Sequence, residues 1–568
     1  MTSAIVVGSG AGGSVAALEL ARAGFDVLVV EKGRNLLPGL GTSGQVGSLF
    51  GNDEVKTGRY FEDQDVILEP RTSRTQAEAQ QGVARSFVGD VNDLPTTVGG
   101  GTIHWDAKTP RLWKQDFAGR SLYGPVPGAN VADWPLSYGD LAPFYDEVEE
   151  RLGVQGDIGA MPAATLAQAP RRRQFVMPPN PPTYSSTLFA EGAATLGYHA
   201  YPFPMAINSV EFDGRPRCNS CGFCSGFGCP INARGGAALN FLHPAIRAGA
   251  ELRSRAFAFR IDLNAGGTAA RGVSFLDSRG RVQRERADVV VVAASAIETA
   301  RLLLLSATSH PAHRGGLGNR SGQLGANLMF HFLTLAVATF AGNVHAWRGP
   351  SSVFTLDDFV GPHTGAAATA AGLPYLKGGI CEVGAGTLVL EEAGLYAALQ
   401  GLTGTAHKDA MRASLLREHL AGLQMVGEDV PQLANRVDLD PDLHDVYGFP
   451  VPRITHSSHP FELASSDFYG PKLAAICQAA PGSVAGQVVP TGTLGGATGT
   501  AHIMGTARMG NDPASSVVDA WGRVHDLDNV YLADGSVFVS AGGVNPTLTI
   551  MALSLRMARH LTRGEHAG

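Results

Sequence analysis

The chain has 568 residues, of which 44% are hydrophobic and 17% are charged. This composition is typical of a folded protein with a large core and excludes a disordered one. The net charge is −7 and no basic block is present, so nucleic acid and anionic membranes are poor partners.

The first predicted elements are a strand over residues 4–7, a glycine-rich turn, a helix and a second strand that ends at Glu31. Gly8 allows the tight turn, Gly10 lets the backbone approach a pyrophosphate, and Gly13 lets the helix pack close to the sheet. The free N–H groups at the helix N-terminus favour phosphates. A carboxylate at Glu31 suits ribose hydroxyls and repels a 2′-phosphate, so the pattern predicts a bound ADP moiety.

This fingerprint begins close to the first residue, which leaves no room for a signal peptide ahead of it. The longest apolar stretch, 328–340, contains His331 and is too short to span a bilayer. We therefore expect no integral membrane segment and a cytoplasmic location, with export alongside a signal-bearing partner left open.

The rest of the chain alternates predicted helices and strands without an internal repeat or a low-complexity linker, which favours interleaved domains. A loop-rich segment over 33–94 leads to a second glycine cluster at 98–105, where backbone can approach a large ligand. The predicted helices are 138–152, 237–250, 295–306, 390–423 and 546–561, and the predicted strands are 257–263, 272–276, 289–292, 328–343 and 530–532.

Four of the six cysteines form one cluster, Cys218, Cys221, Cys224 and Cys229, followed by a proline. Such clustered thiolates suit an iron–sulfur cluster or zinc, and a structural cysteine knot without metal is an alternative. Disulfides are disfavoured in a chain without a secretion signal. The isolated Cys381 and Cys477 are expected to be small buried apolar residues.

The C-terminal part carries several separated motifs, at 501–510, 517–519, 531–536 and 543–547. Together with the N-terminal fingerprint, they resemble the glucose-methanol-choline flavoprotein oxidoreductases along essentially the whole chain. The resemblance implies FAD as the cofactor, His502 as the catalytic histidine and Asn545 as the second catalytic residue. It places Asp534 and Gly535 at the turn that meets the flavin pyrophosphate and ribityl chain.

The chemistry of these residue types agrees with those roles. Oxidation of an alcohol by a flavin needs a base for the hydroxyl proton, and the imidazole of His502 suits that task. The amide N–H of Asn545 could hold the developing alkoxide. A helix that starts at Pro546 and Thr547 would aim its positive end at the flavin.

The loop Gly100-Gly101-Thr-Ile-His104-Trp resembles the Thr-His-Trp loop of pyranose oxidases, in which the histidine is covalently joined to the flavin. This resemblance favours a flavin contact for His104 and leaves a covalent bond open. Asp106 departs from the threonine found in that family. The segment 293–299 resembles the second family signature, except that Ser295 stands where glycine is common.

Multisubunit sugar dehydrogenases of this family carry a three-iron cluster ahead of a similar Cys-Pro string. The resemblance therefore favours an iron–sulfur cluster at the four clustered cysteines over zinc, a metal-free knot or disulfides. Such members also suggest two kinds of partner, an electron-acceptor subunit or a small export subunit.

We therefore predict an α/β protein with a Rossmann-like FAD-binding domain of the glutathione reductase type, interleaved with an α+β substrate-binding domain. The first comprises residues 1–110, 205–330 and 500–568, and the second comprises 111–204 and 331–499. The expected activity is oxidation of an alcohol group of a sugar, glycoside or polyol, and a dehydrogenase is favoured. Two further hypotheses stay open: an oxidase that uses O₂, with a purely structural cysteine loop, and a non-enzymatic flavin-binding electron-transfer or scaffold subunit.

Overall fold

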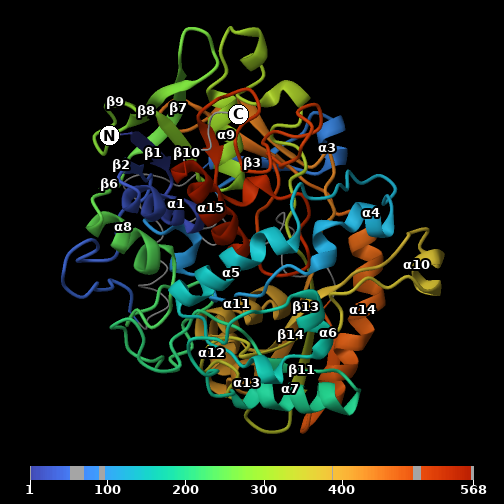
Figure 1. Cartoon of the computed structure of the whole chain (residues 1–568). Helices are drawn as coiled ribbons and strands as arrows, with labels where there is room; N and C mark the ends of the chain where they lie inside the picture. Colours follow the sequence, from blue (N-terminus) through green and yellow to red (C-terminus); the bar gives the residue numbers. More distant parts are fainter. Residues whose placement is uncertain (1, 52–69, 89–95, 387, 490–500, 564–568) are drawn as a thin grey trace.

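The computed structural model describes residues 2–51, 70–88, 96–386, 388–489 and 501–563 (Figure 1). Two main sheets organise the chain, and each is assembled from segments that lie far apart in the sequence. The first, parallel sheet lies in the upper half of Figure 1, and the second, antiparallel sheet lies in the lower half.

The first sheet has five strands in the order β18-β10-β1-β2-β6, and every neighbouring pair is parallel. Its strands are β1 (Ser3–Val7), β2 (Asp26–Val30), β6 (Glu251–Arg253), β10 (Val289–Val292) and β18 (Val530–Leu532). The helix α1 (Ala11–Arg22) follows β1 and packs against α15 (Thr547–Thr562). This arrangement confirms the predicted Rossmann-like unit, because β1, α1 and β2 form a βαβ unit with a parallel strand pair.

The second sheet has six strands in the order β17-β11-β14-β13-β12-β5, with antiparallel pairs throughout. Its strands are β5 (Tyr201–Pro202), β11 (Phe332–Phe340), β12 (Phe354–Leu356), β13 (Gly379–Ala385), β14 (Leu420–Gly427) and β17 (Ser483–Val488). The helices α14 (Pro460–Ala479) and α7 (Tyr184–Thr195) pack against it, and apolar side chains of the helices and of the strands together form a hydrophobic core.

The predicted helix over 390–423 is partly wrong. The structure contains three helices there, α11 (Val389–Gln400), α12 (Gly404–Ala413) and α13 (Leu415–His419), and the chain then enters β14 at Leu420. In β14 the side chains of Ala421, Leu423 and Met425 are buried in alternation, which is the period of a strand. Pairing with β11 and β13 outweighs the helical character of the preceding residues.

Two smaller sheets complete the fold, and the predicted loop segment 33–94 contributes to one of them. The four-stranded sheet contains β3 (Pro70–Arg74), β4 (Arg85–Val88), β15 (Arg436–His444) and β16 (Pro450–Thr455), and the three-stranded sheet contains β7 (Phe257–Leu263), β8 (Ala270–Leu276) and β9 (Val282–Arg286). The remaining α-helices within the described residues are α3 (Gln76–Gln80), α4 (Gly119–Tyr123), α5 (Tyr138–Leu152), α6 (Ala163–Gln168), α8 (His243–Arg247), α9 (Ala296–Leu305) and α10 (Ala366–Ala370).

The helix α5 has the predicted bounds because both of its ends carry strong local signals. Ser137 and Asp140 form a capping box at its start, and Gly153 ends it in the left-handed conformation. Its apolar residues recur at helical spacing and face α15.

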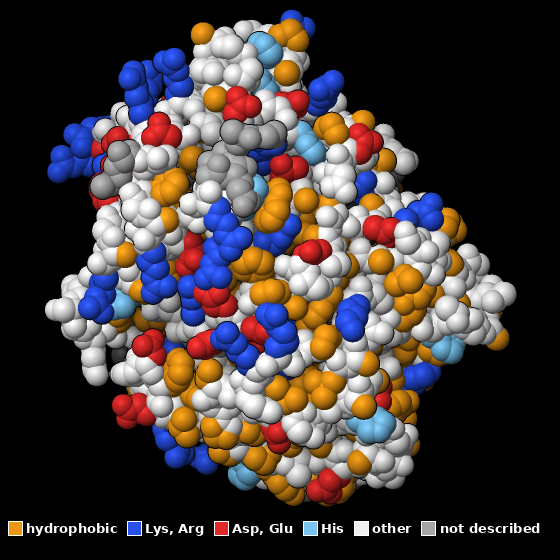
Figure 2. Space-filling model, in the orientation of Figure 1, with side chains coloured by type: hydrophobic (Ala, Val, Ile, Leu, Met, Phe, Trp, Pro, Cys, Tyr) orange, Lys and Arg blue, Asp and Glu red, His pale blue; other side chains and the backbone are white. Residues whose placement is uncertain are grey.

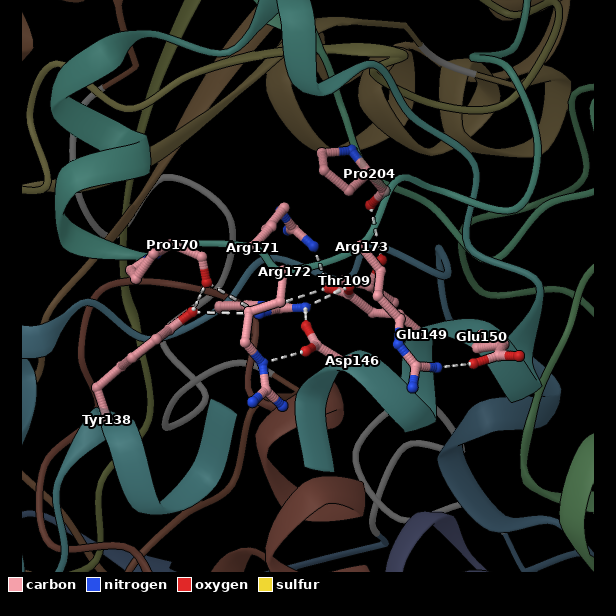
Figure 3. Close-up of polar contacts among 11 residues, drawn as sticks. Thr109, Tyr138, Asp146, Glu149, Glu150, Pro170, Arg171, Arg172, Arg173 and Pro204 are labelled. Carbon is pink, nitrogen blue, oxygen red and sulfur yellow. Dashed lines mark hydrogen bonds and ion pairs between the residues drawn. The ribbon is translucent and has the colours of Figure 1, made fainter. Parts of the chain in front are cut away.

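A buried ionic cluster fastens α5 to two other segments of the chain (Figure 3). Glu149 accepts two hydrogen bonds from the guanidinium group of Arg111, at 2.6 and 3.0 Å, and also pairs with Arg171. Asp146 accepts from Arg111 at 2.7 Å and from Arg172 at 2.9 Å. The side chains of Glu149, Arg111 and Arg171 are all at least nine-tenths buried, so these charges depend on one another.

On the face shown in Figure 2, Lys and Arg side chains are mixed with Asp and Glu side chains. Within the described residues, no helix is both long and apolar enough to cross a membrane.

Candidate active site

A cavity of about 540 Å³ lies at the carboxyl ends of strands β1, β2 and β10. This is where ligands bind in open parallel α/β sheets. Most of the predicted site residues line it: Gly8, Gly10, Glu31, Gly100, Gly101, His104, His502, Asp534, Gly535, Asn545 and Thr547. The sequence motifs that lie hundreds of residues apart therefore form one site.

The glycines of the first turn are required by close backbone contacts. Gly8 has a φ of +96°, and a Cβ atom on it would lie 2.3 Å from the carbonyl oxygen of Ala293. A Cβ atom on Gly13, which does not line the cavity, would lie 2.0 Å from the oxygen of Gly8. The sequence reasoning missed Gly12, where a Cβ atom would lie 1.4 Å from the oxygen of Ala533. These contacts bring the N-terminus of α1 against the cavity.

The carboxylate of Glu31 ties the two glycine loops together. It accepts hydrogen bonds from the backbone N–H and hydroxyl of Ser9, at 2.9 and 2.6 Å, and from the N–H of Gly33 at 2.7 Å. The N–H of Gly99 in turn donates to the Ser9 hydroxyl at 3.0 Å. Burial raises the pKa of Glu31, although these hydrogen bonds oppose the effect.

Ser295, at the start of α9, has a φ of +78° and a ψ of 152°. This region of backbone conformation is almost restricted to glycine, so the serine stores strain beside the cavity. The backbone of Ser295 donates to the carboxylate of Asp534, which also accepts from Thr299 at 2.5 Å. The backbone is therefore strained at Ser295, where glycine is common in the family signature.

Replacing Ser295 with glycine is expected to raise the free energy of unfolding by about 1 kcal/mol, because the strain relieved outweighs the added freedom of the unfolded chain. Urea denaturation followed by far-UV circular dichroism measures the change. Ser278→Gly is the matched control, since Ser278 is exposed and does not have a positive φ. An equal or lower stability of Ser295→Gly would contradict the strain.

The two predicted catalytic residues lie side by side on the cavity wall. Nδ2 of Asn545 is 3.4 Å from Nε2 of His502. Burial, together with the positive charge of Lys108, lowers the pKa of His502 to about 4 despite the opposing charge of Asp106. His502 is therefore neutral at pH 7 and able to accept a proton.

A buried chain of charges holds the amide of Asn545. Its Nδ2 donates to Oε1 of Glu382 at 3.1 Å, and the other oxygen of Glu382 pairs with Nζ of Lys108 at 2.6 Å. Lys108 also pairs with Asp106 at 2.7 Å. Because a carboxylate only accepts hydrogen bonds, Glu382 orients the amide nitrogen of Asn545 toward itself and toward His502. Sequence reasoning missed Lys108 and Glu382, since neither belongs to a recognisable motif.

The cysteine cluster packs directly behind the His104 loop. The N–H of Gly226 donates to the His104 carbonyl at 3.0 Å. The guanidinium group of Arg234 donates to the carbonyl oxygens of Cys224 and Ile103, each at 2.5 Å. All four cysteines of the cluster are free thiols. The loop therefore lies next to the cavity.

The iron–sulfur cluster predicted at Cys218, Cys221, Cys224 and Cys229 stays a prediction. In the part of the chain that the structure describes, no group of three or more His, Cys, Asp or Glu side chains could hold a metal ion. Burial raises the pKa of the Cys218, Cys221 and Cys224 thiols. The isolated Cys381 and Cys477 are buried, as predicted.

Models of known protein families match three long segments of the chain. Residues 130–333 and 431–554 match models described as GMC oxidoreductase, and residues 6–57 match an NAD(P)-binding Rossmann-like domain. The chain is 32% identical over 561 residues to 6‴-hydroxyparomomycin C oxidase of Streptomyces lividus, covering 98% of this chain and 90% of that protein. It is 30% identical to the fructose dehydrogenase large subunit of Gluconobacter japonicus, covering 98% of this chain and 96% of that protein.

Among solved structures, a formate oxidase has a similar fold, with a TM-score of 0.63 and 14% identity over 100% of this chain and 98% of that chain.

Proposed function

Because the chain belongs to the GMC oxidoreductase family, we propose that it uses FAD to oxidise an alcohol group of a sugar, glycoside or polyol to a carbonyl. The proposal rests above all on one observation, the pairing of a neutral His502 with Asn545 on the wall of the cavity between the glycine loops. Two relatives are named as enzymes that act on 6‴-hydroxyparomomycin C and on fructose. These names support a sugar, glycoside or polyol as the substrate.

The residues of the cavity suit FAD. The turn at Gly8 and Gly10 and the N-terminus of α1 would hold the pyrophosphate, and Glu31 would lie at the ribose of the ADP moiety. The N-terminus of α15, at Thr547, would lie toward the flavin ring. When bound, FAD supplies the acceptor of the hydride from the carbinol carbon.

The protein side of the reaction is proton transfer and charge stabilisation. His502 takes the hydroxyl proton of the substrate, since its ring is neutral and lines the cavity. The second N–H of Asn545, held toward His502 by Glu382, donates to the oxygen as negative charge develops. Asn545 and Glu382 are each only 7% exposed, so water has little access to the amide and to the carboxylate that orients it.

Replacing Asn545 with alanine is expected to lower kcat by about 10²-fold and to change KM much less, because the lost N–H acts where charge develops. Steady-state kinetics with D-fructose and 6‴-hydroxyparomomycin C as probes measure both constants. An increase in KM with an unchanged kcat would instead assign Asn545 to substrate binding.

We favour a dehydrogenase that passes electrons to an acceptor other than O₂, as the name of the fructose dehydrogenase relative suggests. An electron-acceptor or small export subunit belongs to the same proposal, since that relative is named a large subunit. An oxidase is the second candidate, favoured by the name of 6‴-hydroxyparomomycin C oxidase. We derive no step through an iron–sulfur cluster.

One preparation tests these points together. Protein purified without oxygen is expected to show a flavin spectrum, and acid precipitation separates free FAD from flavin bound covalently at His104. Faster turnover with an artificial acceptor than with O₂ supports a dehydrogenase, and fast peroxide formation supports the oxidase. Stoichiometric iron and labile sulfide would assign a cluster to the four cysteines, and their absence would leave the loop structural. Protein without flavin would overturn the proposal.

A further inference from the structure

His331 lies directly opposite His502 because of a backbone pairing two residues away. Met329 and Met504 form an antiparallel bridge in which each N–H donates to the other's carbonyl at 2.9 Å. Two residues beyond this pair, the antiparallel register places His331 directly opposite His502. Their Nδ1 atoms lie 2.9 Å apart, and their rings are nearly perpendicular, at 88°.

The contact of His331 with Ala541 determines where the proton of His331 resides. Its Nε2 lies 3.3 Å from the carbonyl oxygen of Ala541, which can only accept a hydrogen bond. Nε2 therefore carries a proton. His331 is 2% exposed, and burial, with the positive charge of Lys377 and the charge that His502 carries when protonated, holds its pKa well below the ordinary value. A neutral imidazole has one N–H, so Nδ1 of His331 is left as an acceptor.

The short contact between the two rings then determines the tautomer of His502. A hydrogen bond between two nitrogens needs one proton, and His331 has none at Nδ1. His502 must donate from its own Nδ1, which leaves a lone pair on Nε2, the nitrogen that neighbours Asn545. We propose that His331 is a positioning residue that holds His502 in the tautomer that can act as a base.

This inference rests on the proposed function, and it adds a reason for the choice of a histidine as partner. A carboxylate at this place would stabilise protonated His502 and raise its pKa, as the aspartate of a Ser-His-Asp triad does. A neutral imidazole fixes the same tautomer without a full negative charge. His502 thus keeps its low pKa and is unprotonated at neutral pH.

Two substitutions separate orientation from packing. His331→Asn keeps an acceptor, since the amide oxygen of asparagine can occupy a place close to Nδ1, whereas His331→Leu removes the acceptor and keeps an apolar volume. With D-fructose and 6‴-hydroxyparomomycin C as probes, His331→Leu is expected to slow anaerobic flavin reduction by about 10²-fold, because a wrong tautomer cannot accept the proton. The probe concentration for half-maximal rate should change little, and His331→Asn should stay within about 10-fold of the wild-type rate.

The direct readout is ¹⁵N NMR of histidine-labelled holoprotein, with the His502 signals assigned from their loss in His502→Gln. The wild type and His331→Asn should show a proton on Nδ1 of His502, and His331→Leu should show the proton mainly on Nε2. A proton on Nε2 of His502 in the wild type overturns the inference even if the chain oxidises alcohols. Failure of both probes to reduce the flavin would count against the proposed function and leave the tautomer measurement valid. If His331→Leu does not fold, the wild-type spectrum and His331→Asn still decide.

Discussion

His502→Ala is expected to lower kcat/KM for alcohol oxidation by about 10²- to 10⁴-fold while the flavin spectrum stays intact. The reason is that the substitution removes the proton acceptor and leaves the glycine loops and Glu31 unchanged. Steady-state kinetics and flavin content per chain measure the two effects. The matched control is His199→Ala, because His199 is exposed, pairs with Asp358 and does not line the cavity. A loss limited to flavin binding would make His502 a structural residue.

The pH profile gives an independent check of the same role. Since burial and Lys108 lower the pKa of His502 to about 4, the base is unprotonated at and above neutral pH. The value of kcat/KM should therefore decline only as the pH falls toward 4, when the ring takes up a proton. A decline centred near the ordinary histidine value of about 6.5 would show that the ring is not held in this environment.

Glu149→Gln is expected to lower the free energy of unfolding by about 3–5 kcal/mol, because it removes the carboxylate that two buried guanidinium groups share. Arg171 loses its ionic partner, and Arg111 keeps Asp146 as its ionic partner together with its hydrogen bonds to Tyr138 and Pro170. Both arginine side chains are 1% exposed, so water cannot replace the missing charge. Urea denaturation measures the change.

The neighbouring residue offers a matched control. Glu150 pairs with Arg173, and their side chains are 54% and 66% exposed. Glu150→Gln should change the stability by less than about 1 kcal/mol, since exposed ion pairs contribute little. If the two variants were equally stable, the buried cluster would not fasten α5 to the segments around Arg111 and Arg171.

The features that were predictable from the sequence depend on local chemistry. The turn at Gly8 needs a positive φ, which glycine adopts readily. The helix α5 has its capping residues directly at its two ends. Both features can therefore be recognised without knowledge of distant contacts. Ser295 is a further local signal. It stands where the family signature commonly has glycine, and its backbone is strained. His502 and Asn545, which the family motifs placed in one site, line the same cavity.

The missed features depend on contacts between distant segments. In the sequence, His331 is only an interruption of an apolar stretch, and its role arises from a register that joins residues 171 positions apart. Glu382 meets Lys108 across 274 positions. The predicted helix over 390–423 wrongly includes the first residues of β14, 420–423, because the pairing partners of this strand lie elsewhere in the chain. No local pattern contains these pairings.

Anaerobic mixing of the flavin-containing protein with D-fructose and 6‴-hydroxyparomomycin C, each with and without deuterium at the carbinol carbon, tests the central claim most directly. We predict loss of the visible flavin absorbance with at least one probe, slower loss with its deuterated form, and no loss within the same time in His502→Ala. A protein whose flavin is bleached by dithionite but by neither probe, or whose bleaching is as fast in His502→Ala as in the wild type, would contradict the account.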